Sequence, residues 1–206
     1  MGEDARRGRF VVFEGGEGSG KSTQAARLAH RWGATLTRQP GGTALGALIR
    51  SVLLDPSTGD VDPKAEALLM AADRAQHVTE LIEPTLGAGG DVVCDRYSGS
   101  QVAYQGYGRG LDPTEVSRLS EWAAAGCRPD LVVLLVVPPE VSVARLGGDL
   151  DRFEAAGAEF HARVAEGFLA QAARDPERWV VVDGTGAVDE VAWRVDDAVD
   201  RRWPVE

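Results

Sequence analysis

A glycine-rich loop that ends in lysine and serine is the part of this sequence whose residue types most directly predict a chemistry. Residues 15–22 read GGEGSGKS and match the pattern G-x-x-x-x-G-K-[ST], between an apolar segment and a stretch with helical spacing. In that setting, N–H groups of the loop and of the helix N-terminus surround phosphate oxygens, Lys21 reaches the β and γ phosphates, and the Ser22 hydroxyl can ligate magnesium. The context favours this interpretation over a glycine turn without a ligand.

Asp95 is the candidate for a second group near the metal. It closes the apolar segment DVVC, and a carboxylate there can reach Mg²⁺ directly or through one of the waters that this ion retains. An ion pair with a neighbouring arginine is the alternative role. The predicted metal residues are therefore Ser22 and Asp95. The triphosphate is expected to contact Gly15, Gly16, Glu17, Gly18, Ser19, Gly20, Lys21, Ser22, Thr23 and Arg145.

These groups need a scaffold, and the apolar pattern predicts one. Segments RFVVFEG, GDVVCDR, DLVVLLVV and RWVVVDG, with the weaker ATLTRQP, recur between stretches with helical spacing. Such alternation predicts a single three-layer α/β domain over residues 1–206, with parallel strands and with ligands beyond their carboxyl ends. The residues at those ends are Glu14, Arg38, Asp95, Pro138 and Asp183. Helices are expected over approximately 20–32, 43–54, 63–87, 112–125, 139–146, 154–174 and 187–202.

The composition excludes several classes of protein. A net charge of -10, from 22 basic and 32 acidic residues, disfavours broad attraction to nucleic acid or to anionic membranes. The longest apolar run, residues 131–137, is far shorter than the ~20 residues that cross a bilayer. Cys94 and Cys127 lack metal-ligand spacing, and the N-terminus has no signal core. We therefore expect a cytoplasmic protein without nucleic-acid or membrane partners.

The surrounding sequence indicates which class of enzyme uses the loop. Neither Lys21 nor Lys64, the two lysines, lies in the [NT]-K-x-D motif of GTPases, and the serine-glycine signature of transport ATPases is not seen. A small-molecule kinase remains, which must align two substrates and neutralise the charge on the transferring phosphoryl group. An acceptor that is itself a phosphate monoester would favour several arginines, because a guanidinium group can donate two hydrogen bonds to phosphate oxygens. The candidates are Arg38, Arg50, Arg74, Arg96 and Arg152.

The order of motifs along the chain resembles that of the bacterial type of thymidylate kinase. The segments FEGGEGSGKST, TRQPGGT, LIRSVLL, KAEALLMAADRAQHV, DRYSGSQVAYQGYGRG, RPDLVVLLVVPPEV and DRFE follow one another in the family's order. The resemblance implies a P-loop NTPase fold with five parallel strands and a short mobile lid over approximately residues 146–154. It also implies Mg²⁺-dependent phosphoryl transfer from ATP to dTMP, and a homodimer. The helix over residues 63–87 could supply the dimer contact, although its apolar face would have the same pattern if it were buried within one chain.

The resemblance further implies roles for individual residues. Arg38 and Pro40 would line the acceptor, Arg50 would lie near its phosphate, and Arg74 near the thymine edge. The base would also be read by the two glutamines of SQVAYQG, with Tyr104 near the sugar and Glu17 facing the 3′-hydroxyl. Met70 stands where a phenylalanine usually stacks on the base. The implied catalytic residues are Lys21, Arg96, Arg152 and Glu17, and the implied acceptor residues are Glu17, Arg38, Pro40, Arg50, Met70, Arg74, Arg96, Gln101, Tyr104 and Gln105.

The sequence departs from the family pattern at a few positions. Gln39 stands where a glutamate is usual, Val136 stands where an aspartate is usual, and Leu146 and the two glycines after it stand where relatives carry lid arginines. Arg152 is thereby left as the candidate lid cation. Phosphorylation of dTMP is the main hypothesis. A deoxynucleoside kinase with Glu14 as its base, and a nucleotide-binding regulator with weakened catalysis, are the alternatives, and a turnover assay separates them.

Overall fold

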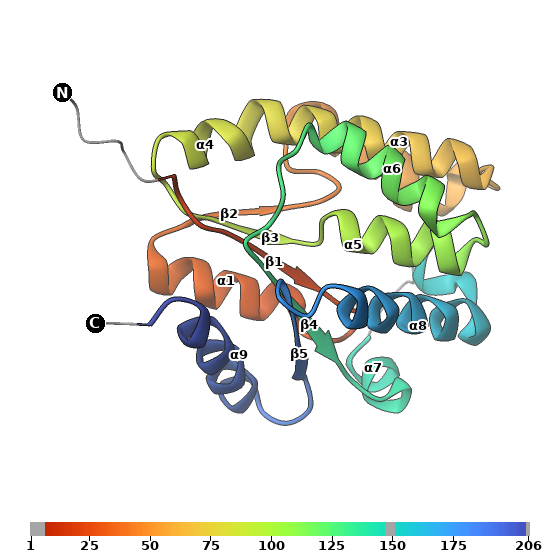
Figure 1. Cartoon of the computed structure of the whole chain (residues 1–206). Coiled ribbons are helices and arrows are strands. Elements are labelled where there is room, and N and C mark those ends of the chain that lie inside the picture. Colours follow the sequence, from red (N-terminus) through yellow and green to blue (C-terminus); the bar gives the residue numbers. More distant parts are fainter. Residues whose placement is uncertain (1–6, 147–150, 205–206) are drawn as a thin grey trace.

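A five-stranded sheet forms the middle layer of the protein (Figure 1). The computed structural model describes residues 7–146 and 151–204. Neighbouring strands pair in parallel in the order β2-β3-β1-β4-β5, which confirms the predicted α/β fold. Four predicted strand ends, Glu14, Arg38, Asp95 and Asp183, are each the last residue of a strand. The strands are β1 (Phe10–Glu14), β2 (Thr35–Arg38), β3 (Val92–Asp95), β4 (Leu131–Val136) and β5 (Trp179–Asp183).

Helices cover both faces of the sheet, as Figure 1 shows with α1 and α9 below it and α3, α4 and α6 above it. Side chains of β1 alternate between the two layers, because Val11 and Phe13 pack with α1 and α9 while Phe10 and Val12 pack on the opposite side. A central parallel strand buried on both faces is apolar throughout for this reason. The helices are α1 (Lys21–Trp32), α2 (Ala44–Leu54), α3 (Pro63–His77), α4 (Glu83–Gly87), α5 (Ser98–Gln101), α6 (Pro113–Ala124), α7 (Pro139–Arg145), α8 (Ala158–Arg174) and α9 (Val188–Arg202).

The helix predicted over residues 63–87 is present, with one irregular turn. α3 continues through a π-helical turn, Val78–Ile82, into α4. Pro84 lies at the start of α4 and has no N–H to donate to the preceding turn, so a local change of hydrogen-bond register accommodates it.

A helical segment over residues 98–108 was missing from the sequence prediction. It consists of α5 and a π-helical turn, Val102–Gly108, and it contains three glycines, which lower helix propensity. Tertiary packing explains their use, because a Cβ on Gly108 would lie 2.6 Å from the ring of Phe160 in α8. The segment therefore forms through close contact with α8, which a propensity argument cannot see. It carries Gln101, Tyr104 and Gln105.

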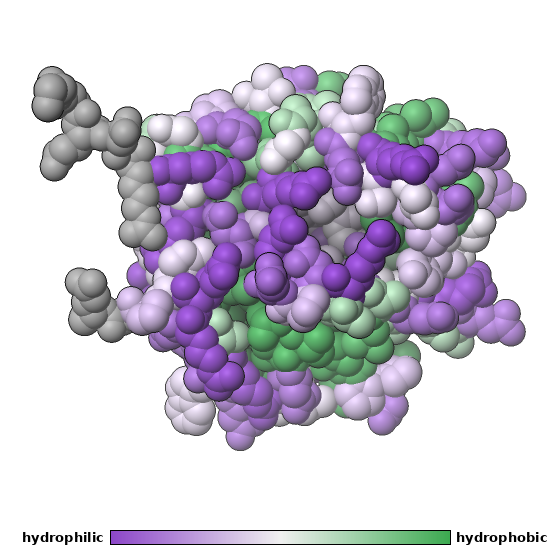
Figure 2. Space-filling view, viewed as in Figure 1, coloured by the Kyte–Doolittle hydropathy of each residue, from purple (hydrophilic) through white to green (hydrophobic). Residues whose placement is uncertain are grey.

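The surface in the view of Figure 1 is largely hydrophilic, with an apolar patch over the edge strand β5 (Figure 2), where Val181 is half-exposed. Among the described residues, no helix combines the length and apolarity that crossing a membrane requires. Residues 147–150 of the predicted lid, which include Gly147 and Gly148, lie outside the described residues.

Candidate active site

The glycine loop joins β1 to α1 beside the start of α7. Gly18 has a φ of 66°, and a Cβ there would lie 2.6 Å from the carbonyl oxygen of Ser142. The Ser142 hydroxyl donates to the carbonyl oxygen of Glu17 at 2.6 Å, so α7 fixes the loop. α1 begins at Lys21 and has no acidic residue in its first turn, so no charge of the helix itself opposes the positive end of its dipole. The loop and helix start therefore have the geometry of a phosphate site.

Lys21 is folded onto the loop. Its Nζ donates to the carbonyl oxygen of Gly16 at 2.6 Å and lies 3.4 Å from Oγ of Ser19. Burial, and then the charge of Arg96, lowers the pKa of Lys21 to about 8. A phosphate group would give this ammonium a charged partner in place of a carbonyl, so Lys21 is placed to bind an anion.

Ser22 and Asp95, the predicted metal residues, are in contact. The Ser22 hydroxyl on α1 donates to Oδ2 of Asp95 at the end of β3. Oδ1 of Asp95 is buried and has no hydrogen-bond partner in the described part of the chain. A hydroxyl beside a carboxylate with an unused oxygen fits Mg²⁺, which takes oxygen ligands and retains waters. Since residues 7–146 and 151–204 contain no cluster of three or more His, Cys, Asp or Glu side chains that could hold a metal, further ligands would come from phosphate and water.

Arg96 connects the glycine loop to the segment 98–108. Its Nη1 donates to the carbonyl oxygen of Gly15 and to Oγ of Ser100, both at 3.0 Å, and its Nη2 donates to Oε1 of Glu17 at 2.5 Å. The Tyr104 hydroxyl donates to the same Glu17 oxygen at 2.7 Å. Burial by itself would raise the pKa of Glu17, but the charges of Arg96 and Lys21 lower it to about 2. Glu17 is thus a carboxylate held between the loop and the tyrosine.

The contact among Glu17, Arg96 and Tyr104 borders a cavity that is open to solvent and has about 550 Å³ of empty space, open solvent included. Apart from Arg38, which is exposed at the end of β2, every residue predicted to bind the acceptor lines it. Gln39 also lines the wall, whereas Val136 lies at the end of β4 beside Asp183 of β5. The lining residues are Glu17, Gln39, Pro40, Arg50, Leu54, Met70, Arg74, Arg96, Tyr97, Ser100, Gln101, Tyr104, Gln105, Asp151 and Phe153.

Positive charge accumulates around this cavity. Burial, followed by the charges of Arg38 and Arg96, lowers the pKa of Arg50, whose Nη1 donates to the carbonyl oxygen of Pro40 at 3.1 Å. Arg74 is 1% exposed and donates from Nη1 to Gln101 and, at 2.7 Å, to Ser120. Within the described residues, none of Arg38, Arg50 and Arg74 forms an ion pair. Guanidinium groups that lie near one another without ion-pair partners predict an anionic ligand.

The two arginines predicted on the lid side have partners within the protein. Arg145 at the end of α7 donates to the carbonyl oxygens of Gly184 at 3.0 Å and Gly186 at 3.3 Å, so it ties α7 to the loop after β5. Arg152 donates to the carbonyl oxygen of Leu53 at 2.8 Å and to Oε2 of Glu66 at 2.6 Å. A role for Arg152 at the transferring phosphoryl group remains a prediction, and it requires exchange of these partners.

Glu14 is used as a structural acceptor. It is fully buried, and it accepts from the N–H groups of Tyr97 at 3.0 Å and Ser100 at 2.9 Å and from the Ser100 hydroxyl. Burial raises its pKa. These bonds fix the start of α5 against the end of β1, and they occupy the carboxylate that a hydroxyl-activating base would need free.

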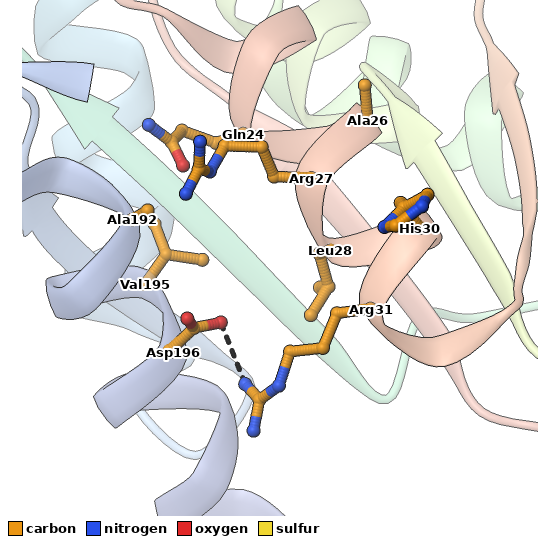
Figure 3. A pocket seen from close by; sticks show the side chains of 9 residues that line it. All are labelled: Gln24, Ala26, Arg27, Leu28, His30, Arg31, Ala192, Val195 and Asp196. Carbon is orange, nitrogen blue, oxygen red and sulfur yellow. Dashed lines mark hydrogen bonds and ion pairs between the residues drawn. The ribbon is translucent and has the colours of Figure 1, made fainter. Parts of the chain in front are cut away.

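A second hollow, of about 930 Å³ and open to solvent, lies between α1 and α9 (Figure 3). Its floor is apolar, with Leu28, Ala192 and Val195. The arginines at its rim have acidic partners. Arg31 forms ion pairs with Asp196 at 2.7 Å, drawn as a dashed line in Figure 3, and with Asp200. Arg27 forms an ion pair with Asp189. In the cavity at the glycine loop, by contrast, Arg50 and Arg74 have no ion-pair partner among the described residues, so that cavity is the candidate active site.

Glu66 is a site residue that the sequence prediction missed. It is fully buried and accepts hydrogen bonds from Gln105, Arg109 and Arg152. Its spacing of four and eight residues from Met70 and Arg74 places all three on one helix face, and this signal could have identified it.

The comparisons with known proteins agree with this geometry. The family model for thymidylate kinase matches residues 13–195. A thymidylate kinase of Leifsonia xyli subsp. xyli is 50% identical over 206 residues, covering 96% of this chain and 97% of that protein. One of Oleidesulfovibrio alaskensis is 46% identical over 204 residues, covering 92% and 96%. The crystal structure of thymidylate kinase from Ehrlichia chaffeensis superposes with a TM-score of 0.77 at 30% identity, covering 94% of this chain and 99% of that one.

Proposed function

The chain belongs to the thymidylate kinase family, and it is a nucleoside monophosphate kinase that transfers a phosphoryl group from ATP to dTMP. We propose which residues bind each substrate and which residues act in the phosphoryl transfer. The contact among Glu17, Arg96 and Tyr104 carries the proposal, because it joins the phosphate loop to the arginine-lined cavity. ATP phosphates bind the loop and the start of α1, and dTMP binds in the cavity. The two phosphates then face each other across Arg96.

The residues of the chain supply charge and alignment. Lys21 binds the β and γ phosphates, and Arg96 and Arg50 hold the acceptor phosphate in line with the donor. Glu17 accepts from the 3′-hydroxyl of the sugar, since its bonds to Arg96 and Tyr104 both end on Oε1. Tyr104 limits space beside the sugar, and Met70 and Arg74 pack along the base. Mg²⁺, when bound by Ser22 and Asp95, would neutralise charge on the donor phosphates.

A coupled assay of ADP release tests this function. With ATP and Mg²⁺, we expect dTMP to give the highest kcat/KM in a panel of nucleoside monophosphates, and thymidine itself to give no turnover. A deoxynucleoside kinase would show the reverse, with phosphorylation of thymidine and none of dTMP. A regulator without catalysis would bind both nucleotides and release no ADP.

Replacement of Asp95 by asparagine should raise the Mg²⁺ concentration for half-maximal activity by about tenfold or more, because an amide removes the negative charge beside Ser22. A titration of activity with Mg²⁺ at saturating ATP measures this. Asp183→Asn is the matched control, since that carboxylate ends β5 and bonds to Thr185. Equal Mg²⁺ requirements in Asp95→Asn and in the wild type would contradict the metal assignment.

We also propose a homodimer that forms through α2 and α3. Leu45, Leu48 and Val52 recur at helical spacing on α2 and are exposed, and Leu68 is exposed on α3, which packs against α2. Apolar side chains gathered on one surface predict a protein interface. We also propose a cytoplasmic location, because Cys94 and Cys127 are buried and form no disulfide, as is usual in a reducing compartment.

Leu48→Glu should convert the dimer to a monomer, because a charge would enter the apolar contact. Light scattering on a size-exclusion column should give twice the chain mass of 21.9 kDa for the wild type and a single chain mass for the variant. Trp193→Glu, which changes an exposed side chain of α9, should remain dimeric. A monomeric wild type would contradict the proposal.

A further inference from the structure

Two glutamines in the cavity wall use their amides differently. Gln101 donates from Nε2 to the carbonyl oxygen of Ala67 at 2.9 Å, and its Oε1 accepts from Arg74. Gln105 donates from Nε2 to Glu66 at 2.8 Å, while its Oε1 is buried and has no partner in residues 7–146 and 151–204. Since Gln105 is fully buried and lines the cavity, it offers the ligand one unused acceptor.

Glu66 determines whether the oxygen or the NH₂ group of the Gln105 amide faces the cavity. A carboxylate that pairs with two guanidinium groups has only acceptor lone pairs, so the amide atom that faces it must be the NH₂ group. The opposite orientation would bring two oxygens together and turn the NH₂ group toward the cavity. The orientation of the amide therefore follows from the chemistry of the pair.

Glu66 is itself held from two directions. Arg109 donates from Nε to Oε1 at 3.1 Å and from Nη2 to Oε2 at 3.2 Å, and Arg152 donates to Oε2 at 2.6 Å. With the bond from Gln105, each carboxylate oxygen accepts two hydrogen bonds, which fills its lone pairs. Rotation of this buried carboxylate away from Gln105 would leave charges unpaired. The amide orientation is thus fixed before any ligand binds.

We propose that Glu66 is a positioning residue for acceptor specificity, which holds Nε2 of Gln105 so that Oε1 accepts from an N–H group of the bound pyrimidine. This inference rests on dTMP as the acceptor. Thymine presents an N3–H donor beside the O4 acceptor, which matches Oε1 of Gln105 and the donors of Arg74. Cytosine presents an unprotonated N3 beside an amino group, so both polarities are reversed. An enzyme with buried groups left unpaired rejects such an analogue strongly.

The test compares kcat/KM for dTMP and for dCMP in the wild type and in Glu66→Gln. A glutamine at position 66 can donate or accept, so both orientations of the Gln105 amide become accessible. We expect the ratio of dTMP to dCMP efficiency to fall by about tenfold or more, mainly through a higher KM for dTMP. An unchanged ratio, including an equal loss for both substrates, would overturn the proposal.

A double-variant cycle tests whether Glu66 acts through Gln105. Gln105→Met removes the amide, so adding Glu66→Gln to it should leave the ratio unchanged within about twofold. A further fall in the double variant would show that Glu66 acts by another route and would overturn the proposal.

Two further variants protect the test from loss of folding. Glu66→Asp keeps the charge that faces Arg109 and Arg152 but withdraws it from Gln105, so it should lower the ratio in the same direction, and it decides the question if Glu66→Gln does not fold. Asp91→Asn removes a carboxylate from the ion pair with Arg9, and it should lower Tm without changing the ratio. A wild type that transfers no phosphoryl group to dTMP would overturn the proposed function as well, whereas turnover with unchanged ratios overturns this inference alone.

Discussion

Replacement of Lys21 by alanine is expected to lower kcat by about 10³-fold, because the transferring phosphoryl group loses its nearest cation. The ammonium is buried and donates to the carbonyl oxygen of Gly16, so no flexible surface lysine can take its place. Lys64→Ala is the matched control, since Lys64 is the second of the two lysines and is exposed on α3. It should keep kcat within about twofold. Near-normal turnover in Lys21→Ala would overturn the donor-site assignment.

The pH dependence of ATP binding provides a second readout for Lys21. Because the pKa of this group in the free enzyme is lowered to about 8, its charge is present below that pH and is lost above it. Affinity for ATP should therefore decrease as the pH rises through about 8, and ATP binding near that pH should take up a proton. Calorimetry in two buffers of different ionisation enthalpy measures the uptake, which Lys21→Ala should abolish.

Replacement of Arg96 by alanine is expected to lower kcat/KM for dTMP by about 10³-fold, since one guanidinium is shared by the glycine loop, Glu17 and Tyr104. Its removal leaves the Glu17 carboxylate largely buried without its ion-pair partner, a change that is costly in itself. Steady-state kinetics with both substrates varied should show losses in KM for dTMP and in kcat together.

The backbone of Arg96 requires its own control. Its φ of 68° lies in the left-handed region, where alanine is strained and asparagine is tolerated better. We expect Arg96→Asn to be as inactive as Arg96→Ala, because both lack the guanidinium. An active asparagine variant would assign the effect to backbone conformation, and kinetics near those of the wild type in both variants would remove Arg96 from the reaction.

Local sequence patterns were sufficient to predict the glycine loop and its place between a strand and a helix. The glycine loop, Lys21 and Ser22 lie within eight consecutive residues, so one motif fixes their geometry once a strand precedes and a helix follows. Asp95 could be paired with Ser22 in advance because the carboxyl ends of parallel strands meet at one edge of the sheet. The acceptor residues depended on the resemblance to the family, and the cavity brings all of them together except Arg38.

The sequence by itself thus determined the fold class and the phosphate loop, because periodicity and motifs are properties of neighbouring residues. The tertiary structure determined which side chains form hydrogen bonds and ion pairs with one another. Gln105 and Glu66 are 39 residues apart, and Glu66 and Arg152 are 86 apart. The helical segment 98–108 likewise forms against α8 despite its glycines. Contacts of this kind depend on how folded elements pack, and that packing determines which buried acceptor remains free to read a base.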